Sequence, residues 1–191
     1  MDKIRILALF GQSGAGKDTV KDILLDRYPD QFHRIISCTT RPPRGYEQNM
    51  KEYHFLTEEE FAGYAYEEQF IEATEFNGWF YGTLLGDLSS EKINIAVLSP
   101  EGVEALLSTA DVYNLQILPI YILAPDKTRI LRALNREEEP NISEIFRRYE
   151  TDIEDFHYIS YFYFPVYNDR EPMDSDEIVS TILKHCDNFF D

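Results

Sequence analysis

Basic residues are scarce in this chain of 191 amino acids. Lys and Arg together number 18 against 35 Asp and Glu, and the formal net charge is −17 at pH 7. A surface with this excess of negative charge is repelled by the phosphates of nucleic acids and by anionic lipids. The composition therefore argues against a general nucleic-acid binder or a membrane-surface protein, and it makes the few basic clusters informative.

Cysteine is also scarce, and no apolar run approaches the length needed to span a membrane. Cys38 and Cys186 form no C-x-x-C pattern, and the four histidines show no metal-ligand spacing. We therefore expect free thiols in a reducing compartment and no structural zinc. The N-terminal apolar stretch is interrupted by charge and followed at once by glycines, unlike a signal peptide. The expected location is the cytoplasm.

Apolar residues alternate between strand-like and helix-like patterns along most of the chain. With 43% hydrophobic residues the chain is able to bury a core, and its length suits a single domain. The pattern predicts strands near 4–10, 33–36, 93–98, 117–123 and 163–167, and helices near 17–28, 100–109, 126–135, 142–157 and 174–188. This alternation predicts an α/β fold with a parallel sheet flanked by helices. Pro165 indicates that the last strand lies at an edge or ends there.

Two segments interrupt this alternation. Residues 37–92 are rich in Thr, Tyr, Phe and Glu, which predicts an inserted subdomain with a few strands and a short helix that begins near Thr57. Residues 136–144 are polar, contain Pro140 and separate two helical stretches. They form either an ordinary surface loop or a lid that closes over phosphates. The lid is favoured by the arginines around the segment: Arg132, Arg136, Arg147 and Arg148.

The most specific motif is the segment from Gly11 to Thr19, with the sequence Gly-Gln-Ser-Gly-Ala-Gly-Lys-Asp-Thr. It lies between a predicted strand and a predicted helix, which is the context of a phosphate-binding loop. Backbone N–H groups and the helix N-terminus surround an anion there, and Lys17 adds a full positive charge. The usual pattern has Ser or Thr after the lysine, whereas this chain has Asp18. A carboxylate beside a polyphosphate is repelled unless Mg²⁺ lies between them or the carboxylate turns toward solvent.

Two further clusters lie within residues 37–92. Arg41 and Arg44 are three residues apart on a proline-stiffened turn, where their guanidinium groups form either a site for one anion or a basic surface loop. Farther along, Glu72 and Thr83 are suited to read the edge of a base by hydrogen bonds. The aromatic residues between them, including Trp79 and Phe80, are expected to pack as the core of a hairpin.

These motifs, in this order and at this spacing, resemble the guanylate kinase family. The resemblance runs through Gly-Gln-Ser-Gly-Ala-Gly-Lys, Ser-Cys-Thr-Thr-Arg-Pro-Pro-Arg, Glu-Tyr-His-Phe-Leu, Phe-Ile-Glu-Ala and Phe-Tyr-Gly-Thr, and it covers nearly the whole chain. It implies the three-layer fold of the P-loop nucleoside monophosphate kinases. The implied parts are a core (1–36, 93–135 and 155–191), an acceptor-binding subdomain (37–92) and a lid (136–154).

The resemblance also implies a role for individual residues. The acceptor monophosphate would be held by Ser37, Arg41, Arg44, Tyr53 and Tyr81, and the guanine would be read by Glu72 and Thr83. ATP would be bound by Gly11, Ser13, Gly14, Ala15, Gly16, Lys17, Asp18, Thr19, Arg132 and Asn168. The catalytic charges would come from Lys17, Arg41, Arg136 and Arg148. Mg²⁺ would be held mainly by the nucleotide phosphates, with Asp18 or Thr19 as candidate contacts through water.

The sequence departs from the family pattern at one strand end. Guanylate kinases usually carry a Leu-Asp-x-Asp-like run before a glycine, and this chain has Val97 and Ser99 at the two aspartate positions. Acceptor contacts and part of the outer shell of the metal depend on such carboxylates. We hypothesise that Asp18 supplies the carboxylate that this strand lacks. The Lys17-Asp18 pair also resembles the ribose bisphosphate phosphokinases, which share the fold and phosphorylate a sugar phosphate.

Three functions are therefore compared. The first is phosphorylation of GMP or dGMP by ATP with Mg²⁺, as a monomer or homodimer without nucleic-acid or membrane partners. The second is the same chemistry on another acceptor, such as ribose 1,5-bisphosphate, but Glu72 and Thr83 favour guanine. The third is a catalytically weak guanylate-kinase-like binding module, although such modules typically lose the phosphate-binding loop that this chain retains.

Overall fold

A five-stranded parallel sheet forms the centre of the structure, a computed structural model that describes residues 3–43, 47–76, 78–136 and 139–190. Its strand order is β2 (Phe32–Arg34), β7 (Ile93–Val97), β1 (Ile4–Phe10), β8 (Leu115–Leu123) and β9 (Phe164–Tyr167). Every neighbouring pair is parallel. The predicted strands and their parallel arrangement are thus confirmed, and β9 with Pro165 lies at an edge, where a missing N–H is tolerated.

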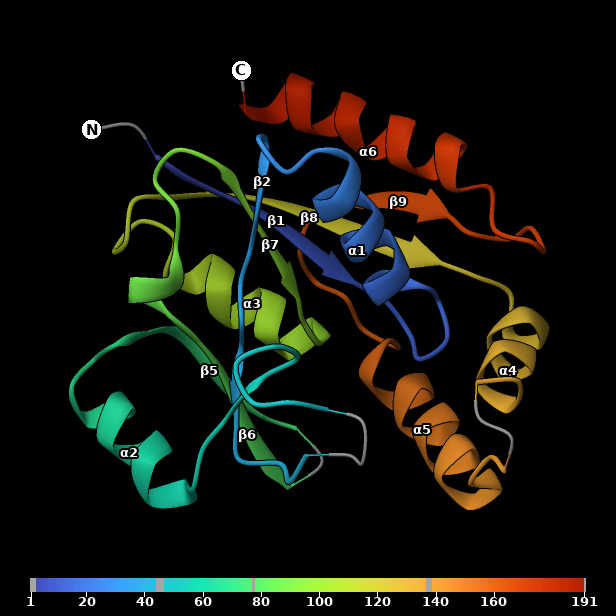
Figure 1. The fold of residues 1–191 in the computed structure, drawn as a ribbon, viewed down its shortest axis with the longest axis horizontal. Helices are drawn as coiled ribbons and strands as arrows, with labels where there is room; N and C mark the ends of the chain where they lie inside the picture. Colours follow the sequence, from blue (N-terminus) through green and yellow to red (C-terminus); the bar gives the residue numbers. More distant parts are fainter. Residues whose placement is uncertain (1–2, 44–46, 77, 137–138, 191) are drawn as a thin grey trace.

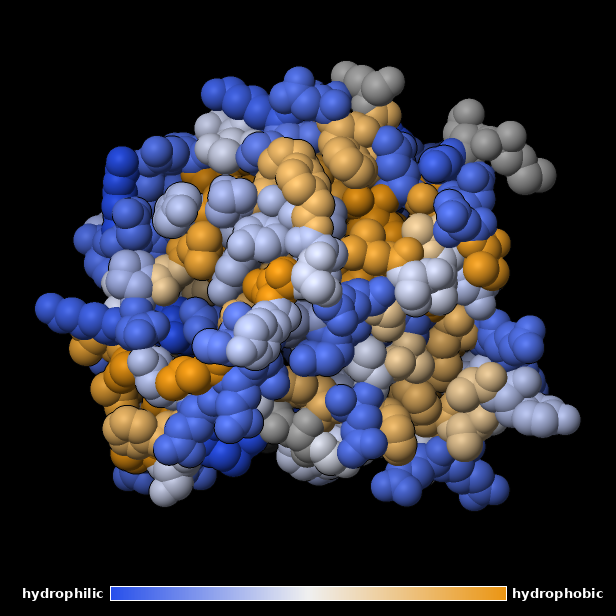
Figure 2. Space-filling model, turned by 180° about the vertical axis from the view of Figure 1, so that it is seen from behind, coloured by the Kyte–Doolittle hydropathy of each residue, from blue (hydrophilic) through white to orange (hydrophobic). Residues whose placement is uncertain are grey.

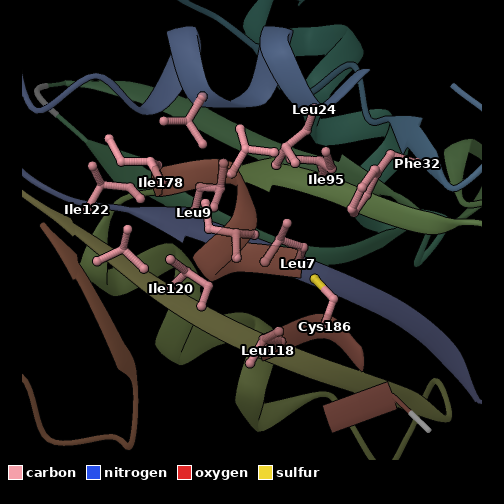
Figure 3. Close-up of a cluster of buried hydrophobic side chains, with 14 of the residues drawn as sticks. Leu7, Leu9, Leu24, Phe32, Ile95, Leu118, Ile120, Ile122, Ile178 and Cys186 are labelled. Atoms are coloured by element: carbon pink, nitrogen blue, oxygen red, sulfur yellow. The ribbon is translucent and has the colours of Figure 1, made fainter. Parts of the chain in front are cut away.

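Helices cover both faces of this sheet. One face packs against α1 (Lys17–Arg27) and α6 (Ser175–Phe190), and the other packs against α3 (Pro100–Ser108). Side chains alternate along β1, so that Leu7 and Leu9 point toward the α1 and α6 layer, whereas Ile6, Ala8 and Phe10 point toward the α3 layer. Figure 3 shows the first of these cores, with Leu24 of α1 and Ile178 of α6 against the strands.

A second, four-stranded sheet lies between β2 and β7 in the sequence. Its order is β4 (His54–Phe55), β3 (Cys38–Thr39), β6 (Trp79–Leu84) and β5 (Phe70–Phe76). The β5–β6 and β3–β6 pairs are antiparallel. Helix α2 (Glu58–Tyr66) packs on this sheet through Phe61, whose ring centre lies 4.5 Å from that of Phe70. The short 3₁₀ helix η1 (Leu85–Asp87) then leads back to the central sheet.

The short helix predicted after Thr57 is confirmed as α2. The Thr57 side chain accepts a hydrogen bond from the Glu60 N–H at 3.2 Å, and the Glu60 carboxylate accepts one from the Thr57 N–H at 2.8 Å. This capping box satisfies donors that the first turn of a helix leaves free. The expectation that the hairpin aromatics are core residues is wrong for Phe80, which is 39% exposed. Helix α2 contacts Phe80 through Phe61, with ring centres 5.5 Å apart, and this contact leaves Phe80 partly open to solvent.

Helices α4 (Asp126–Leu134) and α5 (Ile142–Asp155) follow β8. In Figure 1 this helix pair and the second sheet both project beyond the central sheet on its lower side, while the two chain ends lie at the top. The face in Figure 2 carries hydrophilic residues interspersed with apolar ones. In the described part of the chain, no helix combines the length and the apolar character that crossing a bilayer requires.

Candidate active site

The phosphate-binding loop connects the end of β1 to the start of α1 at Lys17. The backbone of Gly14 has φ 78° and that of Gly16 has φ 98°, both in the left-handed region that favours glycine. A Cβ atom at Gly14 would lie 2.6 Å from the carbonyl oxygen of Arg129, and one at Gly16 would lie 2.5 Å from Asn168 Nδ2. Glycine is therefore required at both positions for two reasons: the backbone conformation and the close neighbouring atoms.

Gly14→Ala is expected to destabilise the protein by about 1–3 kcal/mol, since left-handed strain and a backbone clash add together. Thermal unfolding and an ATP titration measure the effect. The matched control is Gly63→Ala in α2, where a Cβ atom meets nothing within 4 Å and where alanine is expected to stabilise the helix by about 0.5–1 kcal/mol. A Gly14→Ala protein as stable as the wild type would contradict the conformational requirement.

Lys17 folds over the inside of the loop. Its Nζ donates hydrogen bonds to the carbonyl oxygens of Gly11 and Gln12. Burial lowers the pKa of Lys17, while the nearby carboxylates of Asp18 and Asp152 oppose that shift. An anion bound in the loop would favour the charged amine still further, so phosphate binding and the positive charge of Lys17 reinforce each other.

Arg132 and Asn168 brace the loop from behind. Asn168 is buried and its Nδ2 donates to the carbonyl oxygen of Ala15 at 2.8 Å. Arg132 Nη2 donates to Asn168 Oδ1 at 3.1 Å, and Arg132 Nε pairs with Glu171. The two residues assigned to ATP by the resemblance thus lie at the loop, where they hold its backbone in place.

Asp18 and Thr19 lie exposed on the first turn of α1. The Asp18 carboxylate accepts a hydrogen bond from Lys21 at 2.9 Å. Partial enclosure works to raise the pKa of Asp18, but the charges of Lys21, Lys17 and Arg136 lower it on balance. The carboxylate therefore stays ionised beside the loop, as an oxygen donor of the kind that Mg²⁺ prefers.

A cavity of about 140 Å³ is lined by the tip of the loop, α4 and α5. Arg136 and Arg148, both assigned to the lid, line it together with Ser13 and Gly14. Arg148 Nε donates to Glu144 at 2.7 Å, and Arg147 pairs with the same carboxylate. Hydrogen bonding from Arg147 and then from Arg148 lowers the pKa of Glu144 to about 2. The structure thus brings the two predicted arginines to the phosphate-binding loop.

Two residues at this cavity are absent from the sequence-based site. Arg129 of α4 and Asp152 of α5 form a buried ion pair at 3.0 Å, and Asp152 also accepts the Ser13 N–H at 2.8 Å. The sequence contains only a weak indication of their role. Arg129 precedes Arg132 by one helical turn, and Asp152 follows Arg148 by one turn. Charges on amphipathic helices are usually solvent-facing, so the pattern alone gave no reason to pair them.

The second sheet gathers the residues assigned to the acceptor phosphate. Arg41 is 7% exposed, and its Nη2 donates to both carboxylate oxygens of Glu47 at 2.9 Å. Its Cζ lies 5.4 Å from the centre of the Tyr53 ring, which lies 6.1 Å from the Tyr81 ring. The backbone of Ser37 accepts a hydrogen bond from the His54 N–H beside them. Arg44 lies outside the described residues.

The phenol of Tyr53 is held in its neutral form. Burial raises its pKa to about 12, and the negative charge of Asp18 acts in the same direction.

Glu72 and Thr83 are opposite each other on β5 and β6. Glu72 is 5% exposed and Thr83 is 1% exposed, and Thr83 Oγ1 has no hydrogen-bond partner of ordinary geometry among the described residues. Burial raises the pKa of Glu72 to about 7, against the lowering effect of Thr83. Thr83 and Tyr81 are two residues apart on β6 and share one face of the sheet. Two buried polar groups thus adjoin the Arg41 cluster.

The strand end that lacks the two aspartates has its own structure. Ser99 caps α3 and accepts a hydrogen bond from the Gly102 N–H at 3.1 Å. Burial, followed by the charge of Glu101 in α3, raises the pKa of Asp155 of α5 to about 6. Among the residues that the structure describes, no group of three or more His, Cys, Asp or Glu is arranged to hold a metal ion.

A family model and curated relatives that match this chain are all described as guanylate kinase. The family model described as guanylate kinase matches residues 3–184. The chain is 28% identical over 180 residues to the guanylate kinase of Mycoplasma genitalium, covering 94% of this chain and 75% of that protein. It is 27% identical over 185 residues to that of Campylobacter jejuni, covering 94% and 88%.

A solved structure has the same fold. The crystal structure of guanylate kinase from Anaplasma phagocytophilum superposes with a TM-score of 0.67 at 21% identity, covering 96% of this chain and 86% of that one. The parallel sheet flanked by helices is accordingly that of a P-loop nucleotide-binding fold. Because the family model spans nearly the whole length, the chain belongs to the guanylate kinase family.

Proposed function

We propose that the protein transfers the γ-phosphoryl group of ATP to the phosphate of GMP or dGMP. The observation that carries the proposal is the buried Glu72–Thr83 pair beside Arg41, Tyr53 and Tyr81. The guanine edge offers N–H donors to a carboxylate and an acceptor to a hydroxyl, and the buried Glu72 and Thr83 present these two groups opposite each other. The curated relatives named guanylate kinase support the same acceptor.

The proposed chemistry follows from the charges of the two sites. An oxygen of the acceptor phosphate attacks the γ-phosphorus, and the bond to the β–γ bridging oxygen breaks. Lys17 neutralises charge on the donor phosphates. Arg41 holds the acceptor phosphate, which competes with Glu47 for the guanidinium group of Arg41. Arg136 and Arg148 line the cavity at the loop, from which water must be excluded to prevent hydrolysis.

The metal requirement fits the donors at the loop. Bound with ATP, Mg²⁺ neutralises phosphate charge and orients the phosphates. Asp18 and Thr19 are the oxygen donors beside Lys17, whereas Val97 and Ser99 provide no carboxylate at the strand end. We assign to Asp18 the contact with the hydrated metal, and the lowered pKa of its carboxyl group agrees with that role.

Asp18→Asn is expected to raise the Mg²⁺ concentration for half-maximal turnover by about tenfold or more, because a neutral amide is a poorer ligand than a carboxylate. A Mg²⁺ titration at saturating substrates measures this, with ATP binding by calorimetry as a second readout. The matched control is Asp22→Asn, one turn further along α1, whose carboxylate pairs with Arg34 outside the site. An unchanged Mg²⁺ dependence in the Asp18 variant would refute the assignment.

The decisive test of the function is ADP release with ATP and Mg²⁺ against GMP, dGMP, AMP, CMP, UMP, dTMP and ribose 1,5-bisphosphate. We expect turnover confined to GMP and dGMP. Turnover with the sugar phosphate alone would make Glu72 and Thr83 structural residues. Absence of turnover with every acceptor, together with intact ATP binding, would favour a binding module.

We further propose a function for each segment of the chain and a location in the cell. Residues 37–92 would bind the acceptor, residues 136–154 would form the lid, and the rest would form the core. The protein would act in the cytoplasm as a monomer or homodimer on small-molecule substrates. Limited proteolysis with and without ATP and GMP would test the lid, since a closed lid protects its peptide bonds.

A further inference from the structure

Helix α5 is fastened to the phosphate-binding loop through one carboxylate. Asp152 Oδ2 accepts hydrogen bonds from the backbone N–H of Ser13 at 2.8 Å and from Arg129 Nη1 at 3.0 Å. Arg129 Nη1 also donates to the carbonyl oxygen of Ser13 at 3.1 Å. One closed set of hydrogen bonds therefore joins the loop, α4 and α5.

The fold gives this ion pair a fixed orientation. Arg129 is 2% exposed and Asp152 is 5% exposed. Arg129 Nη2 donates to Asp126 at 2.7 Å, and its Cζ lies 5.4 Å from the Tyr149 ring, whose hydroxyl donates to the same Asp126 at 2.8 Å. A buried ion pair gives little stability beyond that of apolar residues of the same size. Its distinctive property is the fixed geometry of its hydrogen bonds.

The fastened part of α5 carries Arg148, which the family resemblance implies to be a catalytic arginine. Arg148 precedes Asp152 by four residues and so lies on the same face of the helix, and both line the cavity at the loop. Beyond Asp152, the ring of Phe156 stacks on Tyr121 with ring centres 5.5 Å apart. The C-terminal half of α5 is thus attached to the core at two successive turns.

We propose that Arg129 and Asp152 are positioning residues that hold Arg148 over the phosphate-binding loop. This inference rests on the proposed function, because it assigns Arg148 to the transferring phosphoryl group. The residues fix the C-terminal end of the lid helix on the loop at Ser13, and Arg148 lies one turn before this fixed point. Neither positioning residue needs to touch the nucleotide.

A double-mutant cycle on kcat tests this dependence. Asp152→Asn is expected to lower kcat with ATP and GMP by about a hundredfold, the usual effect of misplacing a catalytic group, with the KM for ATP changed by less than about threefold. In an Arg148→Ala background the same substitution is expected to lower kcat by less than about threefold, because the group that it positions is gone. Equal losses in both backgrounds would overturn the proposal.

Two further variants separate positioning from folding. Arg129→Met with Asp152→Leu removes both charges together, and we expect thermal stability at or above that of the wild type with kcat as low as for Asp152→Asn. Recovery of wild-type kcat in this variant would overturn the proposal. Glu150→Gln, an exposed position on the same helix, is the matched control and should leave kcat unchanged. A loss there equal to that of Asp152→Asn would also overturn it.

Hydrogen exchange of the ligand-free protein supplies a readout that is independent of turnover. The amides of residues 149–155 are expected to exchange faster in Asp152→Asn than in Glu150→Gln, since the link to Ser13 is weakened. Identical exchange in the two variants would refute the attachment of α5 to the loop. A wild-type protein without turnover on GMP would instead refute the proposed function, and the exchange comparison would still decide the attachment.

Discussion

Lys17→Met is expected to reduce kcat with ATP and GMP by about a thousandfold or more, while the protein stays folded. Removal of a single preorganised donor at a developing charge typically costs 10²–10³-fold in rate. Lys17 also carries a full charge, and its Nζ lies inside the loop with only the carbonyl oxygens of Gly11 and Gln12 as partners in the described structure. Coupled measurement of ADP release gives the rate.

Methionine is the informative replacement because it keeps the length of the side chain without its charge. Burial lowers the pKa of Lys17, which means that the fold penalises the charged ammonium group. Methionine removes this penalty, so the ligand-free variant should be no less stable than the wild type. The matched control is Lys127→Met on the exposed side of α4. A Lys17→Met protein with more than about a tenth of the wild-type kcat would contradict the role of Lys17.

Contiguous motifs explain why much of the site was predictable from sequence. Gly11–Lys17 contains both the conformational requirement for glycine and the charge that faces the phosphate, so no tertiary information was needed. The alternation of strands and helices likewise follows local periodicity, and the observed elements agree within a few residues. Glu72 and Thr83 are eleven residues apart, yet a hairpin makes them neighbours, which the resemblance anticipated.

The positioning residues show where sequence reasoning ends. Arg129 and Asp152 are 23 residues apart on different helices, and their pairing depends on how α4 and α5 pack against the loop. Nothing local distinguishes them from solvated charges. Phe80 shows the opposite case, a residue predicted to be buried that is exposed. An aromatic residue in a strand suggests a core position, but its burial depends on how much of the sheet the short helix α2 covers.

Glu72→Gln is expected to lower kcat/KM for GMP by about a hundredfold or more. The carboxylate accepts N–H groups of guanine, whereas the amide of glutamine turns one acceptor into a donor and leaves a buried mismatch. ADP release measured against GMP concentration gives the change. The matched control is Glu75→Gln, an exposed position on the same strand, which should behave as the wild type. If GMP turnover survives in Glu72→Gln, Glu72 does not read the base.

The same substitution should stabilise the ligand-free protein, in a pH-dependent manner that follows from burial. The pKa of Glu72 is raised to about 7 in the fold, above its value of about 4.5 in the unfolded chain, so the folded state binds more protons between these values. The free energy of unfolding of the wild type therefore falls as pH rises through this interval and levels off above pH 7. Glutamine carries no such charge, so its advantage is absent below about pH 4.5 and reaches roughly 3 kcal/mol above pH 7. Urea unfolding at pH 5 and pH 8 measures the difference. An equal effect at both pH values would mean that Glu72 is not held in an environment that penalises its charge.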